Sequence, residues 1–248
     1  MWKLLVRFCR WLINQWGRTL KIVFRNEHFV VVRKDWGEHV HQPENHDYWV
    51  PLDLVLVTQL KKILELKVVY PIQRLDAATR GLLIFGLSSQ AASILNSTLI
   101  EKKYYALVRG WTQQQGRIQI DLENDTTGDF VFACTDYISL KKFEIPFAIG
   151  KKHSSSRYSI LELELQTGRY HQIRRHLNRI SHPVIGDREH GDSLHNRFFR
   201  EQLQIPYLCL WAFSLNFCFE NENFSFEDAK DDTWEKIFSL AKTHEIST

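Results

Sequence analysis

An arginine and an aspartate lie two residues apart in a polar turn between two apolar segments. Arg74 and Asp76 belong to residues 70–87 (YPIQRLDAATRGLLIFGL), which predict a strand, a turn and a second strand. In an extended chain, residues at i and i+2 project to the same side. A guanidinium beside a carboxylate keeps the acid ionised and oriented, which suits a nucleophile or a base. A loop salt bridge is the commoner use of such a pair, so the triplet alone does not decide its chemistry.

Two later segments combine basic and aromatic residues. Residues 102–110 (KKYYALVRG) predict a basic, aromatic strand, and residues 167–177 (TGRYHQIRRHL) predict a glycine turn that enters a basic helix. One face of this helix is polar and suits an anion; it is expected to hold His171, Arg174, Arg175 and Asn178. The alternative is a helix face that is merely solvated.

Taken together and in this order, the three segments resemble the RluA family of pseudouridine synthases. That family's pattern is roughly H-R-L-D-x-x-T-S-G-L-L, then K-x-Y-x-A-x-V-x-G, then T-G-R-x-H-Q-I-R. The resemblance covers the chain from about residue 21 to about residue 219. Residues 182–187 (HPVIGD) and 190–201 (HGDSLHNRFFRE) make it look like the TruC branch, which modifies transfer RNA.

The resemblance implies an enzyme that isomerises uridine to pseudouridine in transfer RNA, at uridine 65 in the resembled branch. It implies that Asp76 is the catalytic carboxylate, as nucleophile or as base, and that Arg174 pairs with it. Tyr104 is implied to stack on the uracil and to serve in proton transfer. Tyr104 and Tyr105 point to opposite faces of a strand, so one of the two is expected in the core.

RNA contacts are expected from Arg74, Arg80, Lys102, Arg169, His171 and Arg175. Arg74 is expected to take up space vacated by a flipped base. For Arg80 a plain surface arginine is an equal alternative. A basic strip that follows phosphates is expected from Lys102, Lys103, Arg109, Arg169, Arg174, Arg175 and Arg179.

Three departures from the family pattern concern the substrate rather than the catalytic residues. Gln73 stands where the family has His, and Arg80 stands where it has Ser. Residues 34–37 read KDWG where the family has K-P-x-G, so Asp35 replaces a proline. Asp76, Tyr104 and Arg174 are all present.

The sequence leaves alternatives to isomerisation of transfer RNA. The runner-up substrate is large-subunit ribosomal RNA. Five histidines among acidic residues suggest a metal-dependent phosphodiesterase; they are His171, His176, His182, His190 and His195. His171 and His176 lie roughly 140° apart on a helix, so they cannot share one ion, and no H-E-x-x-H occurs. An inactive RNA-binding relative would be expected to lose Asp76. Isomerisation adds and removes nothing, so neither a cofactor nor a metal is expected.

The composition and charge of the chain restrict its possible functions only loosely. The chain has 248 residues and a net charge of +3, which by itself argues neither for nor against nucleic acid. Its four cysteines form no C-x-x-C pair and are expected to be free thiols in the cytoplasm. No apolar run approaches the length of a membrane span. A monomer is expected.

The pattern predicts an α+β fold with a mixed, mostly antiparallel central sheet and flanking helices. Residues 1–19 are expected to form a basic amphipathic extension, and residues 20–248 a single pseudouridine synthase catalytic domain. Helices are expected at 52–66, 89–99 and 232–243, with Ser88 and Asp231 as caps. Strands are expected at 21–25, 28–33, 82–87, 102–109, 117–122, 137–143 and 157–165, with a final strand pair at 207–212 and 213–219.

Overall fold

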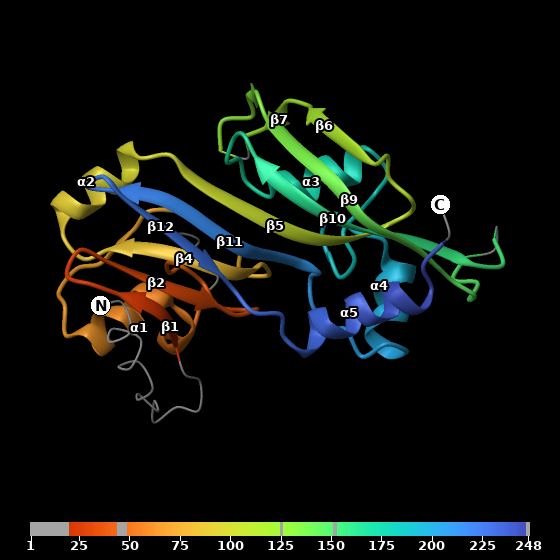
Figure 1. Ribbon diagram of the computed structural model, residues 1–248, viewed down its shortest axis with the longest axis horizontal. Coiled ribbons are helices and arrows are strands. Elements are labelled where there is room, and N and C mark those ends of the chain that lie inside the picture. Colours follow the sequence, from red (N-terminus) through yellow and green to blue (C-terminus); the bar gives the residue numbers. More distant parts are fainter. Residues whose placement is uncertain (1–19, 44–48, 125, 151–152, 247–248) are drawn as a thin grey trace. The chain divides into compact units, whose positions relative to one another are not determined.

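The computed structural model describes residues 20–43, 49–124, 126–150 and 153–246. The predicted basic amphipathic extension, residues 1–19, lies outside these ranges. The chain divides into two compact units. Figure 1 colours the chain by residue number, from red at the N-terminus to blue at the C-terminus. The first unit runs to residue 101 and includes residues 214–228; the second comprises residues 102–213 and the chain from residue 229 onward.

The sheet of the first unit begins with the hairpin that the sequence predicts. Strands β1 (Lys21–Arg25) and β2 (Phe29–Lys34) pair antiparallel, and β2 pairs antiparallel with β4 (Arg80–Gly86). The strand order is β1-β2-β4-β11, where β11 spans Leu210–Phe219 and contributes residues 214–219 to this unit. The short β3 (Tyr70–Pro71) pairs with β4, and β12 (Glu222–Glu227) pairs with β11.

Helices cover both faces of this sheet, which explains its unbroken apolar strands. Val30 and Val32 of β2 pack with helix α1 (Leu56–Leu64), whereas Phe29 and Val31 pack with α2 (Ser89–Ser97). All seven residues of β4 are buried for the same reason. A short 3-10 helix, η1 (Leu52–Leu54), precedes α1, so the predicted helix over 52–66 is broken in two.

The second unit is built on long antiparallel strands. The order is β11-β5-β10-β9-β6. The strands are β5 (Ile100–Arg109), β6 (Gln115–Gln119), β9 (Cys134–Ile145) and β10 (Ser156–Leu165). A separate hairpin, β7 (Leu122–Glu123) with β8 (Phe130–Val131), interrupts the chain between β6 and β9.

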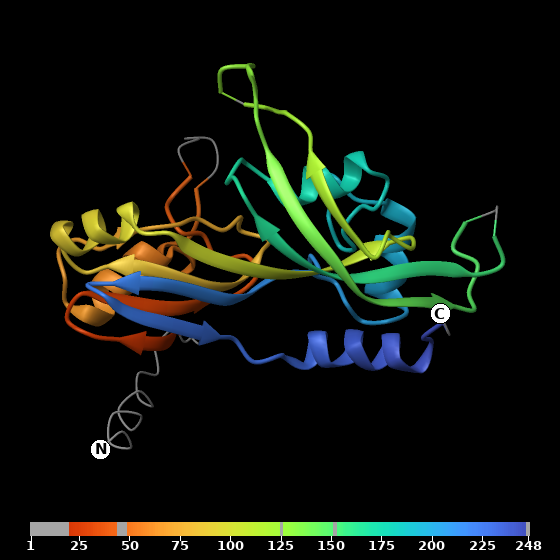
Figure 2. The ribbon, with the colours of Figure 1, turned by 45° about the horizontal axis from the view of Figure 1, so that its top comes forward.

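The core of this unit lies between its sheet and helix α5 (Asp232–Thr243). Figure 2 shows α5 running along the strands, and its Trp234 and Ile237 are fully buried there. Tyr105 stacks on Phe213 with ring centroids 3.9 Å apart and packs against the same cluster. Tyr105 thus packs partly buried against the aromatic core, and Tyr104 on the opposite face of β5 is buried as well. Helices α3 (Gln172–Arg179) and α4 (Ser193–Glu201) complete the unit.

The α+β class and the mostly antiparallel sheet are confirmed, and both predicted caps accept a backbone hydrogen bond. Ser88 accepts from Ala91, and Asp231 accepts from Trp234. The predicted final strand pair is wrong, because 210–219 form one continuous strand and its partner is β12. In the part of the chain that the structure describes, no helix has both the length and the apolar character to cross a membrane.

Candidate active site

A buried lysine holds the turn that carries Asp76. Lys34, at the end of β2, has no exposed surface, and its ammonium donates to the carbonyl oxygens of Ala77 (2.8 Å) and Thr79 (2.6 Å). The backbone N–H of Gly37 also donates to the Ala77 carbonyl, at 2.9 Å. Lys34 and Gly37 thus hold the main chain directly after Asp76. A carboxylate keeps one orientation only when its backbone is fixed in this way.

Burial lowers the pKa of Lys34 to about 7, against the opposing effect of the carboxylates of Glu38, Asp76 and Asp35. The ammonium is thus electrostatically coupled to Asp76 as well as bound to the turn that carries it. Arg74 is exposed whereas Asp76 is partly buried, so the arginine of the triplet is accessible to a ligand.

Two of the departures from the family pattern contact each other. The guanidinium of Arg80 lies 3.9 Å from Asp35 and over the ring of Trp36, with 5.3 Å to the ring centroid. Its other partner is Asp228, at 3.5 Å. Arg80 is only 1% exposed, so both sequence readings of it, a phosphate contact and a surface arginine, are wrong. It is a buried ion-pair residue at the start of β4.

Lys102 and Tyr104 are buried side chains on the same face of β5. The expected RNA contact of Lys102 is contradicted, because its ammonium has no exposed surface. Among the described residues, no atom accepts a hydrogen bond from Lys102 Nζ, and burial lowers the pKa of Lys102 to about 7. Tyr104 stands opposite Leu163 of β10 and keeps 6% of its surface exposed.

Arg174 lies in the buried part of α3, so a merely solvated helix face is wrong for it. Its guanidinium makes two hydrogen bonds to Asp187, at 2.7 and 2.8 Å, and a third to Glu189 at 3.0 Å. Burial opposes ionisation of Asp187, but hydrogen bonds from Arg174 and from the backbone of His190 and Glu189 hold the pKa of Asp187 below its usual value. The fork is thereby fixed in one orientation.

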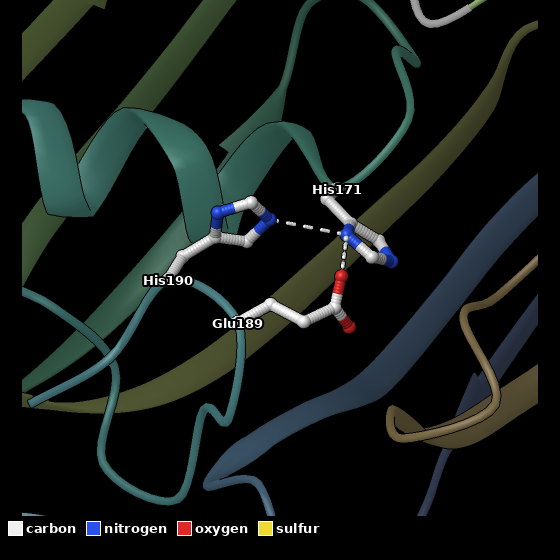
Figure 3. Close-up of side chains that lie close together, drawn as sticks. All are labelled: His171, Glu189 and His190. Carbon is white, nitrogen blue, oxygen red and sulfur yellow. Dashed lines mark hydrogen bonds and ion pairs between the residues drawn. The ribbon is translucent and has the colours of Figure 1, made fainter. Parts of the chain in front are cut away.

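His171 precedes α3 in the left-handed region, with φ of 50°, and is buried. Figure 3 shows its ring meeting two neighbours: Nδ1 lies 3.2 Å from Nε2 of His190 and 3.5 Å from a carboxylate oxygen of Glu189. The ring of Tyr170 stacks on the other side, with centroids 3.7 Å apart. His176, by contrast, faces Thr135 and a backbone carbonyl, each at 2.9 Å.

Arg169 of the glycine turn and Arg175 of α3 bind main-chain carbonyl groups at the β7–β8 hairpin. Arg169 donates to the carbonyl of Phe132 at 3.1 Å, and Arg175 donates to the carbonyl of Glu123 at 2.9 Å. Three large aromatic side chains of this region face solvent; they are Phe130, Phe132 and Tyr170, which are 61%, 54% and 58% exposed. We call these three aromatics with Arg169 and Arg175 the hairpin surface. In Figure 2 the hairpin extends beyond the ends of β6 and β9.

The predicted strip of seven basic residues does not form as a free surface. Lys102 and Arg174 are buried, and Lys103 is paired with Glu162 at 3.0 Å. Arg109 forms an ion pair with Asp192. Of the seven, Arg169 and Arg179 are exposed, whereas Lys103, Arg109 and Arg175 are partly buried and each hold a partner.

The second unit thus brings Arg174 and His171 together with Asp187, Glu189 and His190, while Asp76 and Arg74 belong to the first unit. Because the two groups lie in different units, the pairing of Asp76 with Arg174 stays a prediction. Sequence reasoning missed the roles of Lys34 and Asp187. The available signals were the lysine of residues 34–37 and the aspartate that ends residues 182–187.

Comparison with known proteins assigns the chain to a family. A family model described as RNA pseudouridylate synthase matches residues 28–179, a span that holds the Asp76 turn, β5 and α3. The chain belongs to this family. The resemblance drawn from the three motifs is confirmed, and the protein is an isomerase of the pseudouridine synthase type rather than a phosphodiesterase.

Curated relatives are similar over most of their length. The tRNA pseudouridine synthase C of Vibrio parahaemolyticus is 36% identical over 238 residues, which cover 89% of this chain and 94% of that protein. The protein of the same name from Vibrio cholerae is 35% identical, with 89% and 95% covered. Among solved structures, human RNA pseudouridylate synthase domain containing 1 has a TM-score of 0.65 at 22% identity, covering 92% of this chain and 97% of that one. At this identity the structural likeness supports the fold.

Proposed function

We propose that this protein converts uridine to pseudouridine in transfer RNA, at uridine 65, with Asp76 as the catalytic carboxylate. The observation that carries the substrate is the similarity to proteins named tRNA pseudouridine synthase C, which extends over 89% of this chain. It includes the α4 segment and the residues before it, which distinguished the resembled branch in sequence. The protein is expected to act as a monomer in the cytoplasm, without a cofactor.

The reaction breaks the bond between ribose C1′ and N1 of uracil and forms a bond from C1′ to C5. N1 gains a proton and the proton on C5 is lost, so atoms balance without a co-substrate. Asp76 either attacks the ribose or removes a proton, and both roles need an ionised carboxylate on a fixed backbone. Lys34 and Gly37 provide that fixed backbone by binding the carbonyl of Ala77.

The remaining proposed roles fall to residues of both units: Arg74 belongs to the first, and Arg174 and Tyr104 belong to the second. Arg174, aligned by Asp187, is the partner for the Asp76 carboxylate, and Tyr104 stacks on the uracil and handles its proton. Arg74, which is exposed, takes up the space vacated by the flipped base. His171, Arg169 and Arg175 contact the RNA around the glycine turn.

RNA binding is supported by the hairpin surface. Three half-exposed aromatic rings beside two arginines combine stacking platforms with charges that attract phosphate. A target within a paired stem must be flipped out, which costs a few kcal/mol, so contacts away from the reacting base are needed.

The decisive experiment is the Asp76→Asn variant assayed on unmodified transfer RNA transcripts. Asn keeps the shape of Asp but lacks its charge, so turnover should fall by several orders of magnitude while RNA affinity is kept. Asp53→Asn is the matched control, because Asp53 is an exposed acid of the same unit. Turnover of Asp76→Asn near the parent rate would refute the catalytic assignment.

The substrate is tested by mapping pseudouridine in whole transfer RNA and in ribosomal fragments after incubation with the parent protein. Modification of transfer RNA at uridine 65 is expected. Modification of ribosomal RNA alone would favour the runner-up substrate and leave the role of Asp76 standing.

A further inference from the structure

Three side chains next to α3 converge on a single point. His171 Nδ1, His190 Nε2 and a carboxylate oxygen of Glu189 all lie within 4.8 Å of one another. Figure 3 shows the three side chains pointing toward one another. The two nitrogens are 3.2 Å apart, and the carboxylate oxygen is 3.5 Å from His171 Nδ1. Two ligands of a tetrahedral Zn²⁺, each 2.0–2.1 Å from the metal, are roughly 3.3 Å apart. The two distances from His171 Nδ1 therefore already match the spacing of metal ligands.

The charge around this point favours a cation. Arg174 is a positive group beside this point, and its guanidinium binds the other oxygen of Glu189 at 3.0 Å. Its charge is balanced by Asp187, which it contacts with two hydrogen bonds. With both histidines neutral, one negative charge remains, on Glu189. A carboxylate that binds Arg174 through one oxygen keeps the second oxygen for a metal.

We propose that His171, Glu189 and His190 form a binding site for one Zn²⁺ ion. Two imidazoles and a carboxylate are a donor set that zinc accepts, with a water molecule in the fourth position. The ring nitrogens now share one hydrogen bond, and each neutral ring can carry its proton on the nitrogen that faces away. A metal ion would take the nitrogen of each ring that faces the other side chains.

Bound zinc should inhibit the enzyme, an expectation that rests on the proposed function. His171 belongs to the turn that is proposed to contact RNA, and Glu189 is hydrogen bonded to Arg174. A metal ion that binds both residues would hold the turn before α3 in one conformation. It would also weaken the ion pair between Glu189 and Arg174, because the metal shares the negative charge of the carboxylate. The ion is thus a regulator or inhibitor and takes no part in the isomerisation.

The binding test needs no RNA. Protein stripped of metal with EDTA is titrated with Zn²⁺ by calorimetry, and with Co²⁺ to record the visible absorption of a tetrahedral site. We expect one site, with affinity lowered at least about tenfold in His190→Ala and in Glu189→Gln. His153→Ala, which removes an exposed histidine elsewhere in the second unit, should bind like the parent. Equal affinity in parent and His190→Ala would overturn the proposal.

The inhibition test compares turnover of parent and His190→Ala at increasing Zn²⁺, on a pre-folded substrate. The parent should lose activity over the range in which it binds zinc, and the variant should keep it. Zinc that binds at the expected residues without slowing turnover would overturn the inhibitory role. If the parent forms no pseudouridine in the absence of zinc, the proposed function fails, while the calorimetric result for the metal site still holds.

Discussion

The ammonium of Lys34 donates a hydrogen bond of 2.8 Å to the carbonyl oxygen of Ala77, the residue that follows Asp76. It makes a further hydrogen bond to the carbonyl of Thr79 at the end of the same turn. A charged group that has no exposed surface is stable only when such polar partners surround it. Lys34 is therefore a positioning residue: it sets the conformation of the main chain that presents the proposed catalytic carboxylate.

Lys34→Met should lower the single-turnover rate by roughly 100-fold, because Met fills the space but leaves the carbonyls of the turn without their donor. RNA affinity should change little, since Lys34 is fully buried. The comparison is Lys62→Met on the exposed side of α1, which should behave like the parent. A variant that folds and turns over at the parent rate would show that Gly37 alone holds the turn.

Asp187→Asn should destabilise the protein and slow catalysis together. The change leaves the guanidinium of Arg174, which is 3% exposed, without its main counter-charge, and breaking such a buried pair costs about 3–5 kcal/mol. Thermal unfolding measures the loss of stability, and single-turnover rates measure the loss of alignment. Arg175→Ala serves as the contrast: it should weaken RNA binding while leaving the rate at saturating RNA nearly unchanged. Equal small effects of both changes would argue against a special role for Arg174.

Lys102→Met should stabilise the protein, and the gain should depend on pH. Burial lowers the pKa of Lys102 from 10.5 to about 7 in the folded state, so between these values the unfolded chain holds a proton that the folded chain lacks. The free energy of unfolding of the parent therefore rises with pH in this window, by about 1.4 kcal/mol per unit from this group. The advantage of Met should be largest near pH 7 and shrink as the pH rises. Denaturant unfolding at two pH values checks it; a gain independent of pH would mean that Lys102 stays charged in the fold.

The double variant Phe130→Ala/Phe132→Ala should raise the dissociation constant for transfer RNA at least about tenfold, because base stacking on an aromatic ring contributes about 1–3 kcal/mol per base. Phe147→Ala is the matched control, since Phe147 is also half exposed but lies between β9 and β10. Fluorescence anisotropy gives the affinity, and sedimentation reports self-association. Unchanged affinity with an altered oligomeric state would make the hairpin surface a protein contact instead.

Local sequence signals predicted the elements whose causes are local. Ser88 and Asp231 begin helices because each side chain accepts a hydrogen bond from the backbone of the first turn. The end of the fold was predicted less well, because β11 continues through the predicted break at 212–213. The turn lies instead at Glu220 and Asn221, which both adopt positive φ without a glycine to signal it.

The burial of charged side chains could not be predicted, because it depends on partners distant in sequence. Asp228 and Trp36 enclose Arg80. Asp228 comes from the loop after β12, and Trp36 comes from the turn after β2. Arg174 was assigned correctly to α3, but the sequence did not show that Asp187 is its partner. Helical periodicity gives the direction of a side chain relative to its own helix; it does not tell which other segment covers that face.

Both arginines that anchor the β7–β8 hairpin, Arg169 and Arg175, bind carbonyl groups of its main chain. Every amino acid supplies the same carbonyl, so these contacts place no demand on which side chains the hairpin carries. Mutations there can accumulate without releasing the loop from α3. The hairpin surface that is proposed to bind RNA can thus vary, in nature or in a library of variants, while its main-chain attachment to Arg169 and Arg175 is kept.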